Sequence, residues 1–410
     1  MSNKKLIPEL RFPQFQNQGE WELTSIGEIG AFYYGKSAPK WSLSEDAPTL
    51  CVRYGELYTK FDTIITEVKS RTNIEPSDLK FSKGGEILVP RVGERATDFA
   101  KNCCYLPFPN IAIGEMISVF ETKEFPLFYT HYFRTLWREF AEVVEGQNVK
   151  NLYYINLEPI KIGKPSYEEQ QKVASCLSYL DEVITSHSQK LDLLKDHKKG
   201  LMQNLFPQEG ETIPKYRFKE FENDGDWVEK ILSEVANYEN GKAHEQDISE
   251  NGEFVVVNSK FISTDGAVAK YSNKAFCLAE KGDILMVLSD VPNGRAIAKC
   301  FYVYEENKYT VNQRICKITS FDCDSLFIFY LMNRNPYFLS FDDGVKQTNL
   351  RNDDVQSFPF LIPFNINEQQ KIASCISSLD ALIIGQAERI EHLNLYKKGL
   401  MQGLFPKIND

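Results

Sequence analysis

Residues 30–37, GAFYYGKS, fit the G-x-x-x-x-G-K-[ST] pattern of a loop that binds nucleotide phosphates. In such a loop, free backbone amides surround the phosphate, and a helix begins directly after the Lys-Ser or Lys-Thr pair. Here Phe32, Tyr33 and Tyr34 crowd the loop, and Pro39 follows too soon for a helix to begin. The sequence therefore predicts no nucleotide site, and an ATP- or GTP-hydrolysing enzyme stays an alternative.

Other patterns for catalysis or metal binding are equally weak. The stretch MNRNPYFLSF (332–341) is similar to the Asn-Pro-Pro-aromatic motif of amino-methyltransferases but lacks the second proline. A helix interrupted at Pro336 explains it better. The nine cysteines include no C-x-x-C pair and the five histidines are scattered, so we expect reduced, mostly buried thiols and no metal site.

An internal repeat organises the segments that would position any functional residues. Residues 166–207 align with residues 365–406 without a gap, and direct counting finds 21 of 42 positions identical. The openings of the two halves, from Glu9 and from Lys215, are also similar, whereas the intervening sequence has diverged. A variable region followed by a conserved segment therefore occurs twice. Matching positions include Gly35 with Gly241, Lys36 with Lys242, and Asn151 with Asn349.

Each conserved segment has the pattern of one long helix. Ser166 with Glu169, and Asn365 with Glu368, have capping-box spacing, and a proline follows each segment. Apolar residues then recur every 3.5 positions, which predicts a coiled-coil seam. The seam residues are Val173, Leu177, Leu180, Ile184, Leu191 and Leu194 in the first copy, and Ile372, Ile376, Leu379, Ile383, Ile390 and Leu393 in the second.

Two seam positions are polar in both copies. His187 matches Gln386, and Lys198 matches Lys397. We interpret these residues as fixing the register or lying at the wetter end of the packing. The simplest partner for the first helix is the second, and equivalent helices about a two-fold axis run antiparallel. About 33 residues would give a rod of roughly 50 Å, with the variable regions at opposite ends.

The variable regions contain short aromatic and β-branched runs broken by Gly, Pro, Asn and Asp, which predicts mostly-β domains with helices near 126–144 and 325–341. The expected fold class is α+β, with two such domains and two long helices packed as an antiparallel coiled coil. The expected boundaries are 1–165 and 208–364 for the domains, and 166–207 and 365–410 for the helices.

Composition restricts the class of protein further. Hydrophobic residues make up 42% of the chain, no apolar run is long enough to span a membrane, and the start lacks a signal peptide. We therefore expect a cytoplasmic protein without a membrane partner. The net charge of -10 argues against a protein that coats nucleic acid through a general positive field.

The repeat resembles the specificity subunits of type I restriction-modification enzymes over essentially the whole chain. The residues that carry the resemblance are the EQQK starts (169–172 and 368–371), the KKGLMQ-x-LFP ends, the RF-x-x-F openings with a following Trp, and the strands KGGEILV (83–89) and KGDILMV (281–287). The resemblance implies a non-catalytic reader of double-stranded DNA. Each variable region would be a target-recognition domain for one half of a bipartite, asymmetric site, and the helices would set the spacing.

The resemblance also implies partners. Two methyltransferase subunits would dock on the conserved helices, and two ATP-dependent restriction subunits could join them. S-adenosylmethionine, ATP and Mg would then belong to those subunits, with no cofactor in this chain. Because the net charge is negative, we expect much of the phosphate contact to come from the partners.

Base edges are read by Arg on guanine and by Asn or Gln on adenine. Loops of both variable regions concentrate such residues, and we expect sequence choice at positions that differ between the copies. Asn151 and Asn349 are equivalent, so we expect them to serve the structure. The candidates are Arg53, Tyr54, Lys60, Arg91, Arg95, Lys101, Asn102, Gln147, Asn148 and Lys150 in the first region, and Asn258, Lys260, Asn293, Arg295, Asn312, Gln313, Arg314, Lys346, Gln347, Thr348 and Arg351 in the second. An adaptor that scaffolds partners without reading DNA is the other alternative.

Overall fold

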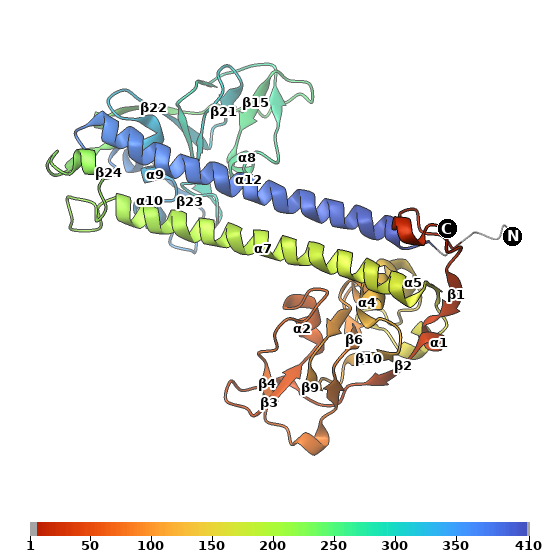
Figure 1. Cartoon of the computed structure of the whole chain (residues 1–410). Coiled ribbons are helices and arrows are strands. Elements are labelled where there is room, and N and C mark those ends of the chain that lie inside the picture. The colour runs from red at the N-terminus through yellow and green to blue at the C-terminus, as the bar shows by residue number, and fades with distance from the viewer. Residues whose placement is uncertain (1–5, 293, 408–410) are drawn as a thin grey trace. The chain divides into compact units, whose positions relative to one another are not determined.

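The computed structural model describes residues 6–292 and 294–407. The chain divides into two compact units, here called the first unit (Met1–Gln189 with Ala387–Asp410) and the second unit (Lys190–Gln386). Both divisions fall inside the two longest helices, α7 (Tyr167–Leu205) and α12 (Ile366–Leu404), each of 39 residues (Figure 1). Each unit therefore combines one sheet-rich region with segments of both long helices, and the α+β prediction is confirmed.

The first unit contains two four-stranded sheets. One is antiparallel with the order β2-β10-β6-β8, and the other has the order β4-β3-β9-β5, in which β3 and β9 run parallel. The pairs β1–β12 and β7–β11 complete the strand structure. The strands are β1 (Glu22–Ser25), β2 (Gly30–Tyr34), β3 (Thr49–Val52), β4 (Arg71–Thr72), β5 (Phe81–Lys83), β6 (Glu86–Pro90), β7 (Val92–Gly93), β8 (Cys104–Leu106), β9 (Pro109–Ile113), β10 (Ile117–Thr122), β11 (Lys150–Asn151) and β12 (Lys161–Lys164).

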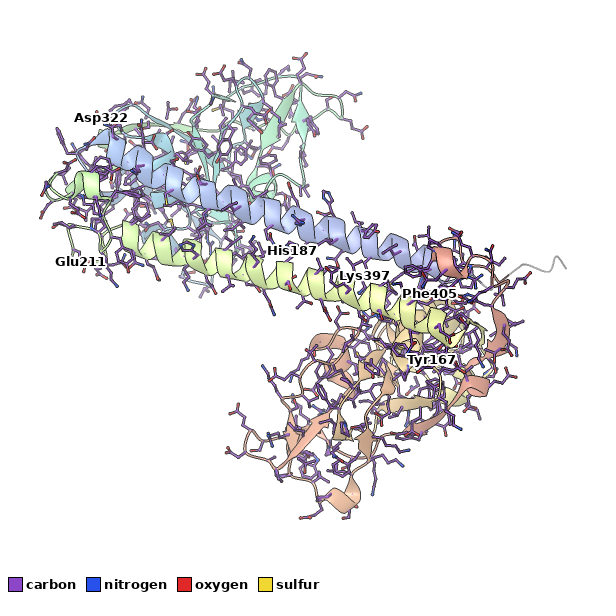
Figure 2. All side chains as sticks on the ribbon, in the orientation of Figure 1. Tyr167, His187, Glu211, Asp322, Lys397 and Phe405 are labelled. Carbon is purple, nitrogen blue, oxygen red and sulfur yellow. The ribbon has the colours of Figure 1, made fainter. Side chains whose placement is uncertain are left out.

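Helices cover the antiparallel sheet of the first unit. The core joins Trp21, Phe128 and Tyr132 to Leu177 of α7 and to Phe405, which directly follows α12. Figure 2 shows Phe405 near Tyr167, where α12 ends beside the start of α7, so these two segments run antiparallel as predicted. The shorter helices are α1 (Ile26–Ile29), α2 (Tyr54–Thr59), α3 (Asp98–Lys101), α4 (Pro126–Thr135), α5 (Trp137–Glu142) and α6 (Tyr154–Leu157), with 3-10 turns at Pro13–Phe15, Lys40–Ser42 and Pro76–Asp78.

The second unit repeats this sheet topology. Its sheets have the orders β14-β22-β18-β20 and β16-β15-β21-β17, and its strand pairs are β13–β24 and β19–β23. The strands are β13 (Val228–Ile231), β14 (Ala236–Asn240), β15 (Phe254–Val257), β16 (Tyr271–Ser272), β17 (Leu278–Ala279), β18 (Ile284–Val287), β19 (Ser289–Asp290), β20 (Cys300–Tyr302), β21 (Tyr309–Val311), β22 (Ile315–Ser320), β23 (Thr348–Asn349) and β24 (Pro359–Ile362). The shorter helices are α8 (Ser259–Ser263), α9 (Ser325–Met332), α10 (Pro336–Leu339) and α11 (Asn352–Gln356), with 3-10 turns at Lys219–Phe221 and Leu232–Glu234.

The helices predicted at 126–144 and 325–341 are each two helices in the structure. The first breaks at Leu136, between α4 and α5. The second breaks before Pro336, which has no N–H to continue the α9 hydrogen bonds and begins α10 instead. Asn335 caps α10 by accepting a hydrogen bond from the Tyr337 amide at 2.9 Å, which confirms the structural interpretation of this stretch.

The repeated EQQK and RF motifs bind each other. Arg11 forms a two-point ion pair with Glu169, and Arg217 forms the equivalent pair with Glu368, with N–O distances of 2.7 to 2.8 Å. Glu169 therefore does not close a capping box as predicted, because both its carboxylate oxygens accept from Arg11. Ser166 keeps its half of the box and accepts from the Glu169 amide at 3.4 Å.

The next residue of the motif attaches each long helix to its sheet-rich region. Gln170 accepts from the Phe125 amide at 2.9 Å and donates to the Pro165 carbonyl at 3.0 Å. Gln369 makes the same two bonds, to the Asp324 amide and the Pro363 carbonyl. These glutamines are buried, so each repeated motif has an internal structural role.

The predicted seam is buried or partly buried at all twelve apolar positions. Its two lysines are ion-paired rather than free in solvent. Lys198 binds Asp380 at 2.6 Å in the second unit, and Lys397 binds Asp181 in the first. Both aspartates lie at equivalent repeat positions, so the same pair of charges occurs in each unit.

The structure also bears on the cysteines and on membrane-spanning segments. None of the nine cysteines forms a disulfide, and six of them are buried. Within residues 6–292 and 294–407, no helix is both long enough and apolar enough to cross a membrane.

Candidate nucleic-acid interface

Five segments of the first unit meet at one set of loops, here called the first loop cluster (35–38, 53–54, 91–95, 114–116 and 145–153). The amides of Gly35 and Lys36 donate to the carbonyls of Ile117 and Ile113, at 3.0 and 2.8 Å. Further bonds run from Gly114 to Val52, from Arg91 to Met116 and from Leu152 to Arg91, at 2.9, 3.0 and 2.8 Å. Backbone hydrogen bonds therefore connect these loops to one another.

The second unit has the same five backbone bonds in its second loop cluster (241–243, 258–260, 288–292, 294–295, 312–314 and 345–351). Gly241 and Lys242 donate to Ile315 and Val311, both at 2.9 Å. The other three run from Asn312 to Val257, from Leu288 to Arg314 and from Leu350 to Leu288, at 3.0, 3.0 and 2.8 Å. One scaffold is therefore present twice.

The side chains on this scaffold differ between the units. The equivalent pairs, first unit then second, are Arg53 and Asn258, Arg91 and Leu288, Gly114 and Asn312, Glu115 and Gln313, and Met116 and Arg314. These changes alter charge and hydrogen-bonding capacity while the backbone stays fixed. Such an arrangement suits recognition of two different ligands by one fold.

The Gly-Lys pair of the phosphate-loop match is a strand crossing. Residues Gly30–Tyr34 form β2, and Gly35 and Lys36 continue it toward the second sheet. A Cβ at Gly35 would overlap the carbonyl oxygens of Ile113 and Gly114, which explains the glycine. Lys36 is exposed and lies 3.4 Å from Asp78, and no helix follows it before the 3-10 turn at Lys40–Ser42, so the match is not a nucleotide loop.

The guanidinium of Arg91 contacts two aromatic rings, one of which, Tyr34, belongs to the same stretch. The Cζ atom of Arg91 lies 4.7 Å from the ring centroid of Tyr34 and 5.5 Å from that of Tyr153. Tyr34 in turn contacts Tyr154 at 4.6 Å between centroids. Burial raises the pKa of Tyr34, and the charge of Arg91 opposes this shift.

The equivalent place in the second unit is polar. Tyr238, Asn240 and Asn352 occupy the positions of Phe32, Tyr34 and Tyr154. Here the Tyr238 hydroxyl lies 2.8 Å from Asn240 Oδ1 and 2.9 Å from Asn352 Oδ1 and can donate its one hydrogen to either, and the Asn240 amide donates to Asn352 at 3.2 Å. Hydrogen bonds thus replace the ring contacts.

Several predicted readers lie in these two loop clusters with exposed side chains. Arg95, Gln147 and Asn148 are exposed in the first cluster, and Lys260, Arg295, Arg314, Lys346 and Arg351 are exposed in the second. Tyr54 is partly buried beside Arg53. Asn293 lies outside the described residues.

Other predicted readers are engaged by the protein itself. Arg53 Nε donates to Ala38 at 3.1 Å, Asn258 caps α8 through Phe261, and Lys150 donates to Gly146. Gln313 donates to Glu245 at 3.2 Å and Gln347 to Ser289 at 2.6 Å. Thr348 is buried and donates to Asp342, and Asn312 is partly buried. Equivalent Asn151 and Asn349 are strand residues of β11 and β23, which fits their expected structural role.

Three candidates of the first unit lie outside its loop cluster. Lys60 directly follows α2 and pairs with Glu56 at 2.8 Å. Asn102 donates to the Asp98 carbonyl at 2.7 Å, and Lys101 lies over the Trp137 ring. Lys101 also lines a cavity of about 510 Å³ together with Arg134, Arg138, Lys397, Lys398 and Lys407. Apart from Lys101, the residues of this basic cavity named here are not predicted readers, and none of them belongs to the first loop cluster.

Sequence reasoning missed Tyr34, Tyr153, Glu115 and Met116. The repeat held a signal for the last two, since Glu115-Met116 precede the strand at 117–122 as Gln313-Arg314 precede the strand at 315–320. Among the described residues, no group of three or more His, Cys, Asp or Glu side chains is arranged to hold a metal ion.

Comparison with known proteins agrees with this architecture. The sequence matches the family described as type I restriction modification DNA specificity domain over residues 101–196 and 224–395. The match covers more than half of the chain, and the chain belongs to this family. The type I restriction enzyme MjaVIII specificity subunit of Methanocaldococcus jannaschii is 24% identical over 427 residues, which cover 97% of this chain and 94% of the relative.

Solved structures show the same fold. The S subunit of a type I restriction-modification system from M. genitalium matches 98% of this chain and 100% of its own, with a TM-score of 0.64 and 15% identity. A chain from a structure of the complex assembly and conformational transition of the type I R-M system matches 94% of this chain and 97% of its own, with a TM-score of 0.55 and 15% identity.

Proposed function

We propose that this chain, a type I restriction-modification specificity subunit, reads a bipartite and asymmetric sequence in double-stranded DNA. Each unit reads one half of the site through its loop cluster. The observation that carries the proposal is the pair of equivalent clusters, in which five backbone hydrogen bonds recur while the side chains between them differ. A duplicated reader with one invariant frame needs only side-chain changes to recognise a second sequence.

The long helices would dock two methyltransferase subunits and set the spacing between half-sites. Repeated residues such as Glu169, Gln170 and Phe405 are used inside the units, so they do not need a partner to explain them. Docking instead suits residues that are identical in both copies yet exposed. These are Gln171, Lys172, Ser175, Lys199 and Gln203 in the first copy, and Gln370, Lys371, Ser374, Lys398 and Gln402 in the second.

In this assembly, methyl transfer belongs to the partners. S-adenosylmethionine would bind the methyltransferase subunits, and ATP and Mg would serve two restriction subunits where these are present. This chain would contribute sequence choice and spacing, with no cofactor of its own.

Sequencing of methylated adenines tests the DNA-reading function. Cells would carry the methyltransferase partner with either the intact chain or a chain whose second loop cluster is exchanged for that of a relative. The methylated motif should change in one half only. An unchanged motif would favour the adaptor alternative, and a change in both halves would contradict a reader in which each unit recognises its own half-site. Insertion of one or two turns in both long helices should lengthen the unspecified gap between the half-sites.

The nucleotide-hydrolysing alternative has a direct test. The purified chain should show no ATP turnover, because the GAFYYGKS stretch forms a strand and its crossing. Robust hydrolysis that disappears in Lys36→Ala would support an NTPase and contradict the proposal. Ala243→Ser, which restores the Gly-Lys-Ser end of the pattern in the second unit, is the matched control and should also give no turnover.

A further inference from the structure

Arg91 is a partly buried cation whose guanidinium has no polar partner among the described residues. It lies between β6 and β7, where backbone bonds to Met116 and Leu152 fix its main chain. Its guanidinium makes no ion pair and no hydrogen bond with any residue in 6–292 or 294–407, and its Nε atom is buried without a partner. An Nε–H group that has lost water without gaining an acceptor is costly, so its presence needs an explanation.

Stacked rings hold this guanidinium in one orientation. It lies against Tyr34 and Tyr153, and the contacts continue inward from Tyr34 to Tyr154 and from Tyr154 to Phe32. The rings of Phe32 and Tyr154 are stacked, 5.6 Å apart with an interplanar angle of 3°. Phe32 contacts the fully buried Phe120 at 4.7 Å, so the series is anchored in the core. Such stacking fixes the plane of an arginine while leaving its donors unused.

The unused donors define the ligand. We infer that Arg91 recognises the edge of a guanine base in the half-site read by the first unit. Its flat fork of N–H groups matches the adjacent O6 and N7 acceptors of guanine, whose major-groove edge offers both at once. The inference rests on the proposed DNA-reading function and names one residue and one base for it.

The second unit supports a role in sequence choice. Its equivalent position is Leu288, and the ring stack is replaced there by the network of Tyr238, Asn240 and Asn352. The stack and the arginine are therefore present together in one unit and absent together from the other. The backbone bonds at this position are the same in both units, so the arginine is not needed to form them.

Three substitutions test the inference in the complex of the full chain with its methyltransferase partner. Arg91→Leu installs the residue of the second unit, Arg91→Gln installs a side chain that suits adenine, and Arg91→Lys keeps the charge without the fork. Lys69→Ala is the control, since Lys69 is exposed and pairs only with exposed Glu67. The readouts are the methylated motif in cells and competition binding to duplexes with each base at every position of the site.

Arg91→Leu should remove a preference for guanine of about 10- to 100-fold at one position of one half-site. Arg91→Gln should shift that position toward adenine, and the other half-site should keep its sequence in every variant. Arg91→Leu and Arg91→Gln could instead lower the affinity equally for all duplexes, while Arg91→Lys keeps the affinity and the methylated motif stays the same. That result would show a phosphate contact and overturn the inference. A half-site without a guanine preference in the intact complex would overturn it as well.

Failure of this inference is distinguishable from failure of the proposed function. If the Arg91 variants leave the motif intact while exchange of the first loop cluster changes half of it, the unit reads DNA through other residues. If exchange of the whole cluster also changes nothing, the DNA-reading function itself is wrong. Should Arg91→Leu prevent assembly, Arg91→Gln and Arg91→Lys still report the base preference.

Discussion

Arg11 and Glu169 bind each other at two points, from Nε at 2.8 Å and from Nη2 at 2.7 Å, across 158 residues of sequence. The side chains are 6% and 1% exposed, so the pair is almost fully removed from water. It joins the opening of the chain to the start of α7, and Arg217 with Glu368 does the same in the second unit. The RF opening and the EQQK start therefore form one contact in each unit, which explains why both motifs occur in both halves of the sequence.

Removal of one partner of this pair should destabilise the first unit strongly. Arg11→Ala leaves a buried carboxylate without its counter-charge, which typically costs about 3–5 kcal/mol. Chemical denaturation of the chain, with hydrogen exchange of the first turns of α7, measures the effect. The double variant Arg11→Met with Glu169→Leu should be less destabilised than Arg11→Ala. Equal losses in both would show that the buried charge is not the cause.

The far end of the chain completes the core of the first unit. Phe405 contacts Phe128 and Tyr132, with centroids 5.4 and 4.8 Å away. Phe405→Ala should cost about 3–5 kcal/mol and speed hydrogen exchange in Pro126–Thr135. Phe364→Ala is the control, because Phe364 is 89% exposed, and should change neither. Unaltered exchange in α4 after Phe405→Ala would contradict this packing.

Two glycines should respond to alanine in opposite directions. Gly35→Ala places a Cβ against the carbonyls of Ile113 and Gly114 and should destabilise the strand crossing by about 1–3 kcal/mol. Gly200 lies within α7, where an added methyl group would meet no other atom within 4 Å, so Gly200→Ala should stabilise by about 0.5–1 kcal/mol. Thermal unfolding of both variants checks the signs. A stabilising Gly35→Ala would refute the close approach.

His131 should make the first unit sensitive to acid. Burial, with the charges of Lys397 and Arg134, lowers its pKa from an ordinary 6.5 to about 3, and Asp62 opposes the shift. Because the folded pKa is depressed, the stabilising contribution is present above pH 6.5 and is lost as the pH falls toward 3. The slope should approach about 1.4 kcal/mol per pH unit. Denaturation at a series of pH values measures it.

His131→Tyr provides the matched comparison, since Tyr330 occupies the equivalent place and donates to Asp380 at 2.9 Å. The Asp181 Oδ2 atom is buried and has no hydrogen-bond partner among the described residues, so a hydroxyl could serve it. This variant should lose the acid slope between pH 6.5 and 3. An identical slope in the variant and the parent would assign the effect to another group.

The ring stack predicts a further, separate result. Tyr154→Ala removes the link between Tyr34 and Phe32 and should loosen Arg91, which lowers selectivity in the half-site read by the first unit. Asn352→Ala removes the equivalent link in the second unit and should affect only the other half-site. Competition binding with substituted duplexes distinguishes the two. Loss of selectivity in both half-sites from either variant would refute independent readers.

Local patterns in the sequence were sufficient for many of the elements. The 3.5-residue period and the flanking prolines predicted α7 and α12, and the stretches KGGEILV and KGDILMV predicted β6 and β18. The internal repeat by itself indicated two similar regions. These features are readable because periodicity, turns and caps depend on neighbours a few residues apart.

The candidate site could be predicted only in part, because its contacts join residues that are far apart in the sequence. Arg91 was a candidate, but the two aromatic rings that contact it come from β2 and from the residues after β11. No spacing rule relates segments that are so far apart in the sequence. The capping box failed because Arg11, distant in sequence, takes both oxygens of Glu169. The repeat, the two long helices and many of the strands follow from local patterns along the chain. Which loops meet and which charges pair depends on contacts between distant residues that only folding brings together.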